Sequence, residues 1–318
     1  MTETYELENK RVWIAGHNGL LGSSIRRRLL TENCDIITVD RKNLDLRKQS
    51  DVEYWISKKR PNTVIISAAT VGGIYANSTR PAEFLYDNLM IEANIIEAAR
   101  KYGIEKLLFL GSSCAYPKAA LQPMEEEILL SGRLEKTNEY FSIAKIAGIK
   151  LCEAYRKQYG CNFISAIPAN LYGPQDNFDL YDSHVIPALI QKMHHARMQD
   201  KKSIQIWGTG MAIREFLFVD DCADAVIFLL KKYNKGAHIN IGSGEEITIK
   251  NLAHKISRVV DFNGHITFDT TKPDGAPKKV LNGSRLRELG WIKNVTLDDG
   301  ISLTYEWFEN NLNLHSSN

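Results

Sequence analysis

The sequence predicts an α/β protein with a doubly wound parallel sheet and a smaller C-terminal substrate lobe. Short apolar and β-branched runs alternate with longer helical patterns through the first half of the chain. These runs are continuously apolar, which indicates strands buried on both faces, as in a parallel sheet covered by helices. The first run leads directly into a glycine-rich turn. Strands and helices that alternate in this way are joined by right-handed crossovers, which produces the doubly wound arrangement.

Five strands and four helices are expected before position 170. The strands are expected at 11–15, 36–39, 63–68, 107–110 and 163–167. The helices are expected at 22–30, 51–60, 81–102 and 138–159. Pro81 suits the first turn of its helix, because the N–H that proline lacks would have no helical partner there. Residues 1–169 are therefore expected to form one domain around this sheet.

The pattern loosens beyond position 170, where loops rich in Gly, Asp, Asn and Pro appear. Four further helices are expected, at 186–198, 220–232, 249–260 and 297–310. Residues 170–318 are assigned mainly to the smaller substrate lobe. The apolar run at 237–241 is the exception, because it is a candidate strand for return to the first sheet.

Length and composition exclude several classes of protein. The 318 residues fit about two domains. The chain has 40 Lys and Arg against 38 Asp and Glu, a net charge of +2, which argues against a dedicated nucleic-acid binder or a polybasic membrane binder. Its five cysteines are odd in number and widely spaced, which disfavours a disulfide framework or a structural zinc site. With a polar N-terminus and no apolar run of about 18 residues, a cytoplasmic protein without a membrane span is expected.

The glycine-rich turn has the spacing of a phosphate-binding cradle. Gly16, Gly19 and Gly22 form G-x-x-G-x-x-G between the first strand and the first helix, with Asn18, Leu20 and Leu21 between them. Glycines allow the tight turn and the close approach of backbone, and the helix N-terminus presents N–H donors to a pyrophosphate. In this strand–turn–helix context the motif predicts a dinucleotide-binding (Rossmann) domain over 1–169. The alternative is a glycine-rich turn that serves helix packing only.

The residues after the second strand bear on which dinucleotide binds. Asp40 can accept from a ribose 2′-OH, which favours NAD, whereas Arg41 can bind the 2′-phosphate of NADP. Both residues are present. We favour NADP on Arg41, with NAD as the alternative and a solvated loop charge as the other interpretation of Arg41.

Two further motifs carry a family resemblance. Ser112 and Cys114 follow the fourth strand, and Phe141 precedes Lys145 by four residues in a helical pattern. With the glycine turn, this arrangement resembles the extended short-chain dehydrogenase/reductase family, whose signature is a strand-end Ser and a Tyr-x-x-x-Lys helix. Six segments, spread over nearly the whole chain, resemble the GDP-L-fucose synthases within that family, which are GDP-4-keto-6-deoxy-mannose 3,5-epimerase-4-reductases. The segments are 14–19, 109–114, 143–153, 170–174, 183–189 and 272–275.

The resemblance implies roles for the reactive side chains. Cys114 and His184 match the pair that exchanges protons at C3 and C5, which the neighbouring 4-keto group makes acidic. A thiol with a pKa near 8.5 can act as a base once its surroundings tune it. Ser112 would bind the 4-keto oxygen and Lys145 the nicotinamide ribose. Without the motif, Cys114 would be an inert buried thiol and His184 a structural histidine more often than not.

The resemblance also implies binding residues and a partner. Further cofactor contacts are expected at Ala68, Ala69, Pro168, Asn170 and Leu171, besides Lys145 and His184. GDP-sugar contacts are expected in the second lobe, at Lys192, Trp207, Arg214, Asp274 and Lys278, although surface ion pairs and a core tryptophan would fit these residues too. The His194-His195 pair is not assigned to a metal, because adjacent helical residues diverge by about 100°. By analogy with the superfamily, the helices at 81–102 and 138–159 would form an intersubunit bundle in a homodimer.

Two positions depart from the family pattern. Phe141 stands where the family has the tyrosine, and Phe has no hydroxyl to protonate a developing alkoxide. Tyr140 is five residues before Lys145, so it points about 100° away from the shared face and cannot simply replace the missing group. Asn18 stands where a basic residue beside the cofactor is expected, which weakens the preference for NADP. The sequence leaves open whether Phe141 is natural or a replacement made to trap a complex.

Several functions remain open at this stage. The first hypothesis is double epimerisation followed by NADPH reduction, with the reduction impaired by Phe141. The alternatives are epimerisation alone, action on a related GDP-4-keto sugar such as a heptose, and a non-catalytic nucleotide-sugar binder. A dehydratase is disfavoured, because the motif after Ser113 lacks the Asp-Glu pair that the resemblance would require.

Overall fold

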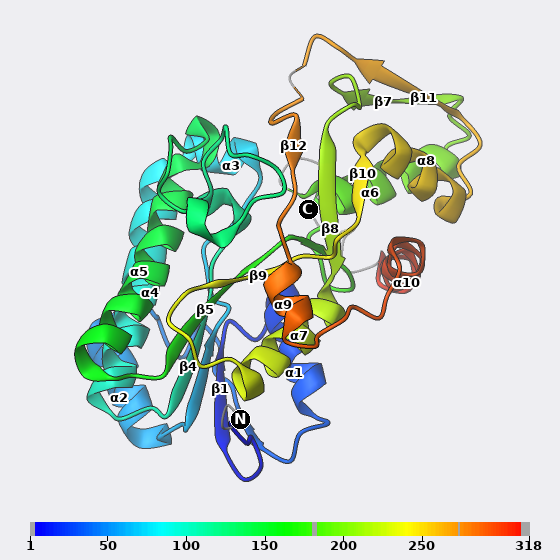
Figure 1. The fold of residues 1–318 in the computed structure, drawn as a ribbon. Coiled ribbons are helices and arrows are strands. Elements are labelled where there is room, and N and C mark those ends of the chain that lie inside the picture. Colours follow the sequence, from blue (N-terminus) through cyan, green and yellow to red (C-terminus); the bar gives the residue numbers. More distant parts are fainter. Residues whose placement is uncertain (1–3, 180–182, 273, 313–318) are drawn as a thin grey trace.

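The structure is a computed structural model that describes residues 4–179, 183–272 and 274–312. A six-stranded parallel sheet, in the order β2-β1-β3-β4-β5-β9, forms the larger lobe (Figure 1). Its strands are β1 (Arg11–Ala15), β2 (Asp35–Ile37), β3 (Thr63–Ile66), β4 (Lys106–Leu110), β5 (Phe163–Pro168) and β9 (Ile239–Ile241). β3, β4 and β5 are buried along their whole length, which confirms the predicted fold class.

Helices cover both faces of this sheet. α1 packs against α7 on one face, and α2 packs against α4, which packs against α5, on the other (Figure 1). The bounds are α1 (Leu20–Leu29), α2 (Gln49–Lys59), α4 (Pro81–Lys101), α5 (Glu139–Tyr159) and α7 (Val219–Lys232). α1 begins two residues before the predicted start, so Gly22 lies inside the helix. The chain leaves β1 for β2 on one side and returns to β3 on the other, and this switch point is where such sheets bind ligands.

Short helices follow the carboxyl ends of β3 and β4. They are α3 (Ile74–Thr79), η1 (Ser113–Ala115), η2 (Glu126–Ile128) and η3 (Lys136–Asn138). None of them was predicted, because each has six residues or fewer and shows no full helical period.

The smaller lobe has its own sheets and core. β8 (Ile213–Phe218) pairs with β6 (Asn170–Tyr172), β10 (Glu246–Thr248) and β12 (Lys278–Lys279), and β7 (Ser203–Trp207) pairs with β11 (His265–Asp269). The helices of this lobe are α6 (Val185–Met198), α8 (Ile249–Val260) and α10 (Leu297–Asn310). A separate apolar core, which includes Ile190, Phe216, Ile256 and Phe308, holds them together.

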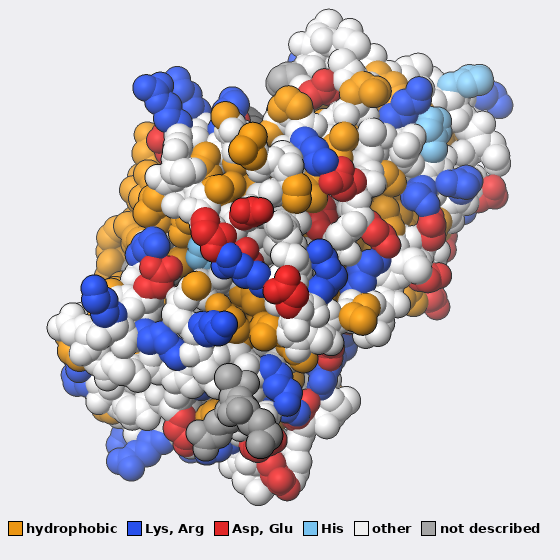
Figure 2. Space-filling view, in the orientation of Figure 1, with side chains coloured by type: hydrophobic (Ala, Val, Ile, Leu, Met, Phe, Trp, Pro, Cys, Tyr) orange, Lys and Arg blue, Asp and Glu red, His pale blue; other side chains and the backbone are white. Residues whose placement is uncertain are grey.

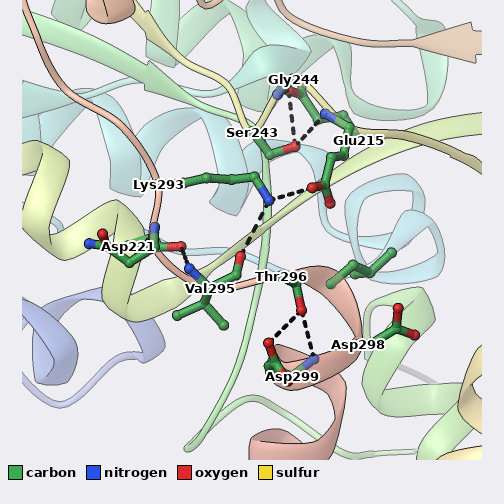
Figure 3. Close-up of polar contacts among 12 residues, drawn as sticks. Glu215, Asp221, Ser243, Gly244, Lys293, Val295, Thr296, Asp298 and Asp299 are labelled. Atoms are coloured by element: carbon green, nitrogen blue, oxygen red, sulfur yellow. Dashed lines mark hydrogen bonds and ion pairs between the residues drawn. The ribbon is translucent and has the colours of Figure 1, made fainter.

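Residues beyond position 170 also complete the larger lobe. α7, β9 and α9 (Ser284–Glu288) contribute buried side chains to the first core. Asp221 on α7 accepts hydrogen bonds from the backbone N–H groups of Asn294 and Val295, at 3.0 and 2.9 Å. Figure 3 shows this clamp beside Thr296, whose hydroxyl caps α10 at the N–H of Asp299. The C-terminal segment is thus tied to both lobes.

Across the described residues, none of the helices combines the length and the apolar character that crossing a bilayer would need.

A buried histidine connects β9 to the segment after β4. The Tyr116 hydroxyl lies 3.1 Å from Nε2 of His238 and donates to Oδ1 of Asn240 at 2.6 Å. Burial lowers the pKa of His238 to about 4, whereas the unfolded chain keeps an ordinary value near 6.5.

We expect this histidine to make the protein less stable in acid. Between pH 6.5 and 4 the unfolded chain binds a proton that the folded chain does not. The free energy of unfolding therefore decreases as the pH is lowered through this range, by up to about 3 kcal/mol. His238→Gln should remove this slope, and urea unfolding of both proteins at pH 7 and 4.5 measures it. Parallel pH dependences of the wild type and the variant would contradict the assignment.

Candidate active site

The glycine turn brings the ends of β1 and β3 against the start of α1. Gly16 has φ +94°, and a Cβ there would lie 2.5 Å from the backbone nitrogen of Ala68. A Cβ at Gly22 would lie 2.0 Å from the carbonyl oxygen of Gly16. Gly19 is the N-cap of α1 and provides no capping side chain, so the first N–H groups of the helix, at Leu20 and Leu21, keep their capacity to bind a phosphate. The residues present therefore fit a dinucleotide pyrophosphate.

Asp40 lies beside this turn. Asn18 Nδ2 donates to Asp40 Oδ1 at 2.9 Å, and His17 Nε2 is 3.5 Å from the same oxygen. Burial lowers the pKa of His17, and the Asp40 carboxylate opposes part of that change. Arg41 is exposed. Of these two residues, Asp40 thus contacts the glycine turn, and Asn18 orients its carboxylate.

A reactive cluster surrounds Cys114 after the carboxyl end of β4. The N–H of Cys114 donates to Oγ of Ser112 at 3.2 Å. Its Sγ accepts hydrogen bonds from Nδ2 of Asn138 at 3.1 Å and from Nζ of Lys279 at 3.3 Å. Phe141 packs against it. Burial raises the pKa of the Cys114 thiol, but the Lys279 ammonium and the hydrogen bonds from Ser112 and Asn138 outweigh burial and bring the pKa below its ordinary value.

Phe141 and Lys145 lie on one face of α5, as their four-residue spacing predicts. Both are buried, and Nζ of Lys145 lies 5.9 Å from the centre of the Phe141 ring and 4.8 Å from that of Phe109. Tyr140 is 45% exposed, so it points away from this face. The structure thus agrees with the argument that Tyr140 does not replace the missing phenol.

Lys145 is paired with an acid that sequence reasoning missed. Its Nζ donates to Oε1 of Glu92 at 2.9 Å, and both side chains are almost fully buried. Oε2 of Glu92 is buried with no hydrogen-bond partner among the described residues. Burial raises the pKa of Glu92, and Lys145 opposes part of that rise. The 81–102 helix carries four acids, Glu83, Asp87, Glu92 and Glu97, so the sequence alone did not single out Glu92.

In the smaller lobe, three of the predicted GDP-sugar residues come together. Both carboxylate oxygens of Asp274 accept from Thr209, through its N–H and its hydroxyl, each at 2.7 Å. Arg214 donates to the carbonyl oxygens of Ala276 at 2.7 Å and of Asp274 at 3.4 Å. Trp207 ends β7, directly before the loop that Thr209 belongs to. It is 68% exposed, which excludes a core tryptophan, and Nζ of Lys272 lies 5.7 Å from the centre of its ring.

Other predicted residues lie in different surroundings. Nζ of Lys192 donates to the carbonyl oxygen of Gln205 at 2.7 Å. Lys278 forms an ion pair with Glu246 at 2.6 Å, and its neighbour Lys279 is the lysine that reaches Cys114. His184 is exposed and immediately precedes α6.

The remaining predicted cofactor residues follow strand ends of the large sheet. Ala69 follows Ala68 after β3, and Pro168 ends β5. Asn170 and Leu171 belong to β6, where Nδ2 of Asn170 donates to the carbonyl oxygen of Glu215 at 2.8 Å. Within the described part of the chain, no three His, Cys, Asp or Glu side chains are arranged to hold a metal ion.

The family is decided by a comparison with known proteins. The NAD dependent epimerase/dehydratase family matches residues 12–242, which include the glycine turn, Cys114 and the α5 face. The chain belongs to this family.

Individual members of the family are similar over nearly the whole chain. A GDP-L-fucose synthase of Sinorhizobium fredii is 56% identical over 97% of this chain and 98% of its own length. Among solved structures, a GDP-6-OMe-4-keto-L-xylo-heptose reductase from C. jejuni superposes with a TM-score of 0.91 at 34% identity, over 97% of this chain and 99% of its own. A GDP-L-fucose synthetase from Naegleria fowleri bound to NADP gives 0.90 at 26% identity, over 98% of both chains. Both solved structures therefore align with the larger and the smaller lobe of the present chain.

Proposed function

We propose that this chain is a GDP-L-fucose synthase-like enzyme that acts on GDP-4-keto-6-deoxy-mannose. It would invert C3 and C5 of the sugar and then reduce C4 with NADPH, the reduction being impaired by Phe141. The observation that carries the proposal is the Cys114 thiol, held by Lys279 and Asn138 next to Ser112 and Phe141. The identity of 56% to a GDP-L-fucose synthase supports the choice of substrate.

The thiol accounts for the epimerisation. The 4-keto group makes the hydrogens at C3 and C5 acidic, because the electron pair left by either proton delocalises onto the ketone oxygen. Cys114 Sγ takes a proton from one face, and His184 returns one to the other face. Ser112 would donate a hydrogen bond to the same ketone oxygen and stabilise the negative charge that develops there.

The reduction lacks its usual proton donor. NADPH supplies a hydride, which would go to C4, and the C4 oxygen then needs a proton. Phe141 faces Lys145 where the family has a tyrosine and cannot supply it. Loss of a general acid costs about 10²–10⁴ in rate, so epimerised 4-keto product should accumulate before reduced product.

Product analysis tests this proposal. The protein is incubated with GDP-4-keto-6-deoxy-mannose and NADPH, and the products are identified by NMR. We expect C3- and C5-inverted 4-keto sugars first and GDP-L-fucose slowly. Bound but unaltered substrate would favour a non-catalytic nucleotide-sugar binder.

A related GDP-4-keto heptose is the second candidate substrate. The GDP-6-OMe-4-keto-L-xylo-heptose reductase from C. jejuni is similar over 97% of this chain, and the heptose in its name carries the same 4-keto group on a longer sugar. Faster turnover of a GDP-4-keto heptose than of the 6-deoxyhexose would select this alternative. Inversion of either sugar without reduction would identify an epimerase.

NADP is the proposed cofactor, because a similar GDP-L-fucose synthetase from Naegleria fowleri is bound to NADP; NAD is the alternative. Asn18 is uncharged and orients Asp40, so it supplies no positive charge for a 2′-phosphate, and Arg41 is the cation that we assign to this group. Asn18→Arg should improve kcat/KM for NADPH about tenfold relative to NADH, because a charge-assisted hydrogen bond contributes about 1.5–3 kcal/mol. Initial rates with both cofactors measure this ratio, and an unchanged ratio would place the 2′ group elsewhere.

The exposed face of α4 and α5 is the proposed dimer interface. The two helices pack together, and their exposed residues include Tyr86, Tyr140 and Ile143. Figure 2 shows apolar side chains gathered at the left edge of the molecule, over these helices. A second copy that packs its α4 and α5 here would form a four-helix bundle. Sedimentation tests this: the wild type should be a dimer and Ile143→Glu a monomer.

The five free cysteines fit the proposed cytoplasmic location.

A further inference from the structure

A lysine of the smaller lobe contacts the reactive thiol of the larger one. Nζ of Lys279 lies 3.3 Å from Sγ of Cys114, a contact between residues 165 positions apart. Lys279 ends β12, which runs parallel to β8 with Lys279 opposite Arg214. The ammonium therefore belongs to the sheet that also holds Arg214 and Lys278, two of the predicted GDP-sugar residues.

The position of Lys279 is fixed from both lobes. The N–H of Val280 donates to Oε1 of Gln122, and the N–H of Met124 donates to the carbonyl oxygen of Val280, each at 2.8 Å. On the other side, the N–H of Leu281 donates to Oε2 of the buried Glu215 at 2.8 Å. Figure 3 shows Glu215 beside Ser243 and Gly244, and the N–H of Gly244 also donates to this carboxylate.

Consecutive strand residues point to opposite faces, which separates the two lysines of β12. Lys278 turns toward β10 and pairs with Glu246 at 2.6 Å. Lys279 turns toward η1 and Cys114. The groups around the thiol are Ser112 before η1, Asn138 of η3, Phe141 of α5 and Lys279 of β12. Of these four, Lys279 carries a full charge.

We propose that Lys279 is a positioning residue that holds Cys114 as a thiolate. The smaller lobe, which is expected to bind the sugar nucleotide, would then also keep the catalytic base deprotonated. This rests on the proposed function. A thiolate can take the C3 or C5 proton directly: the S–H bond forms as the C–H bond breaks, and the electron pair moves to the C4 oxygen. A neutral thiol would first have to lose its own proton, and the structure places the lysine where it makes that loss favourable before substrate arrives.

The test measures the thiol itself. Iodoacetamide alkylation of the Cys114 peptide is followed by mass spectrometry from pH 5 to 10 in wild type, Lys279→Met, Lys279→Arg and Lys278→Met, without nucleotide sugar. An opposite charge within about 4–6 Å shifts a pKa by 1–3 units. Lys279→Met should therefore slow alkylation at pH 7 at least tenfold and move its midpoint to higher pH. Lys279→Arg should keep the wild-type midpoint, and Lys278→Met should leave it unchanged.

Two results would overturn the proposal. One is a wild-type Cys114 that titrates like an ordinary thiol, near pH 8.5. The other is a Lys279→Met protein, folded by its urea unfolding curve, whose midpoint equals that of the wild type. Because the assay contains no sugar, it stays decisive if the proposed function fails. A low midpoint that depends on Lys279, together with no proton exchange on any GDP-4-keto sugar, would reject the function and keep the thiolate.

Discussion

Replacing Phe141 with tyrosine is expected to raise the rate of hydride transfer by about 10²–10⁴-fold, because it restores a general acid for the C4 oxygen. Phe141 is buried on the α5 face beside Lys145 and Cys114. A phenol there would lie in the field of the Lys145 ammonium, and a nearby positive charge favours proton release. Stopped-flow loss of NADPH absorbance with GDP-4-keto-6-deoxy-mannose measures the step.

The matched control is Tyr140→Phe. Tyr140 is the neighbouring residue and is exposed, so its loss should leave hydride transfer unchanged. A Phe141→Tyr protein that reduces no faster than wild type would show that the register or the mechanism is wrong. Loss of reduction in Tyr140→Phe would show that this tyrosine supplies the proton after all.

Replacing Glu92 with glutamine is expected to lower the free energy of unfolding of the ligand-free protein by about 3–5 kcal/mol, because it leaves the buried Lys145 ammonium without its partner. The two side chains are 4% and 2% exposed and meet at 2.9 Å. The Phe109 and Phe141 rings around Lys145 offset only part of the loss. Urea unfolding at pH 7 measures the difference.

Glu83→Gln is the control on the same helix. Glu83 is 59% exposed and pairs with Arg80 at 3.6 Å, so its removal should change stability by less than about 1 kcal/mol. If Glu92→Gln and Glu83→Gln changed the free energy of unfolding equally, Glu92 would not be stabilising a buried Lys145 ammonium. The double variant Glu92→Leu, Lys145→Met should recover much of the lost stability, since it removes both charges.

Local patterns were sufficient to predict the strands and the long helices of the larger lobe. The strands around 63–66 and 107–110 are largely apolar because helices cover both of their faces. This pattern can be recognised from the local sequence alone, with no knowledge of distant contacts. The strands of the smaller lobe were missed for the opposite reason. β7 has the alternation of a half-buried strand over only five positions, which is a shorter and weaker signal than those of the central strands. β12 consists of two lysines and has no strand pattern.

The candidate site likewise has some residues that local sequence patterns predict and others that only long-range contacts place. The glycine turn and the Phe141–Lys145 spacing are local, and their geometry follows from the backbone. Lys279 and Glu92 reach their partners across 165 and 53 residues, through pairings that periodicity does not specify. Lys278 was therefore predicted as a binding cation, while the lysine beside it is the one that faces the thiol.

Deuterium exchange at the sugar carbons tests the central claim most directly. GDP-4-keto-6-deoxy-mannose is incubated in D₂O with wild type and with Cys114→Ser, and label at C3 and C5 is followed by NMR. We predict that the wild type labels both carbons and that Cys114→Ser does so at least 10²-fold more slowly. Equal rates in the two proteins, or no label with the wild type, would contradict the account.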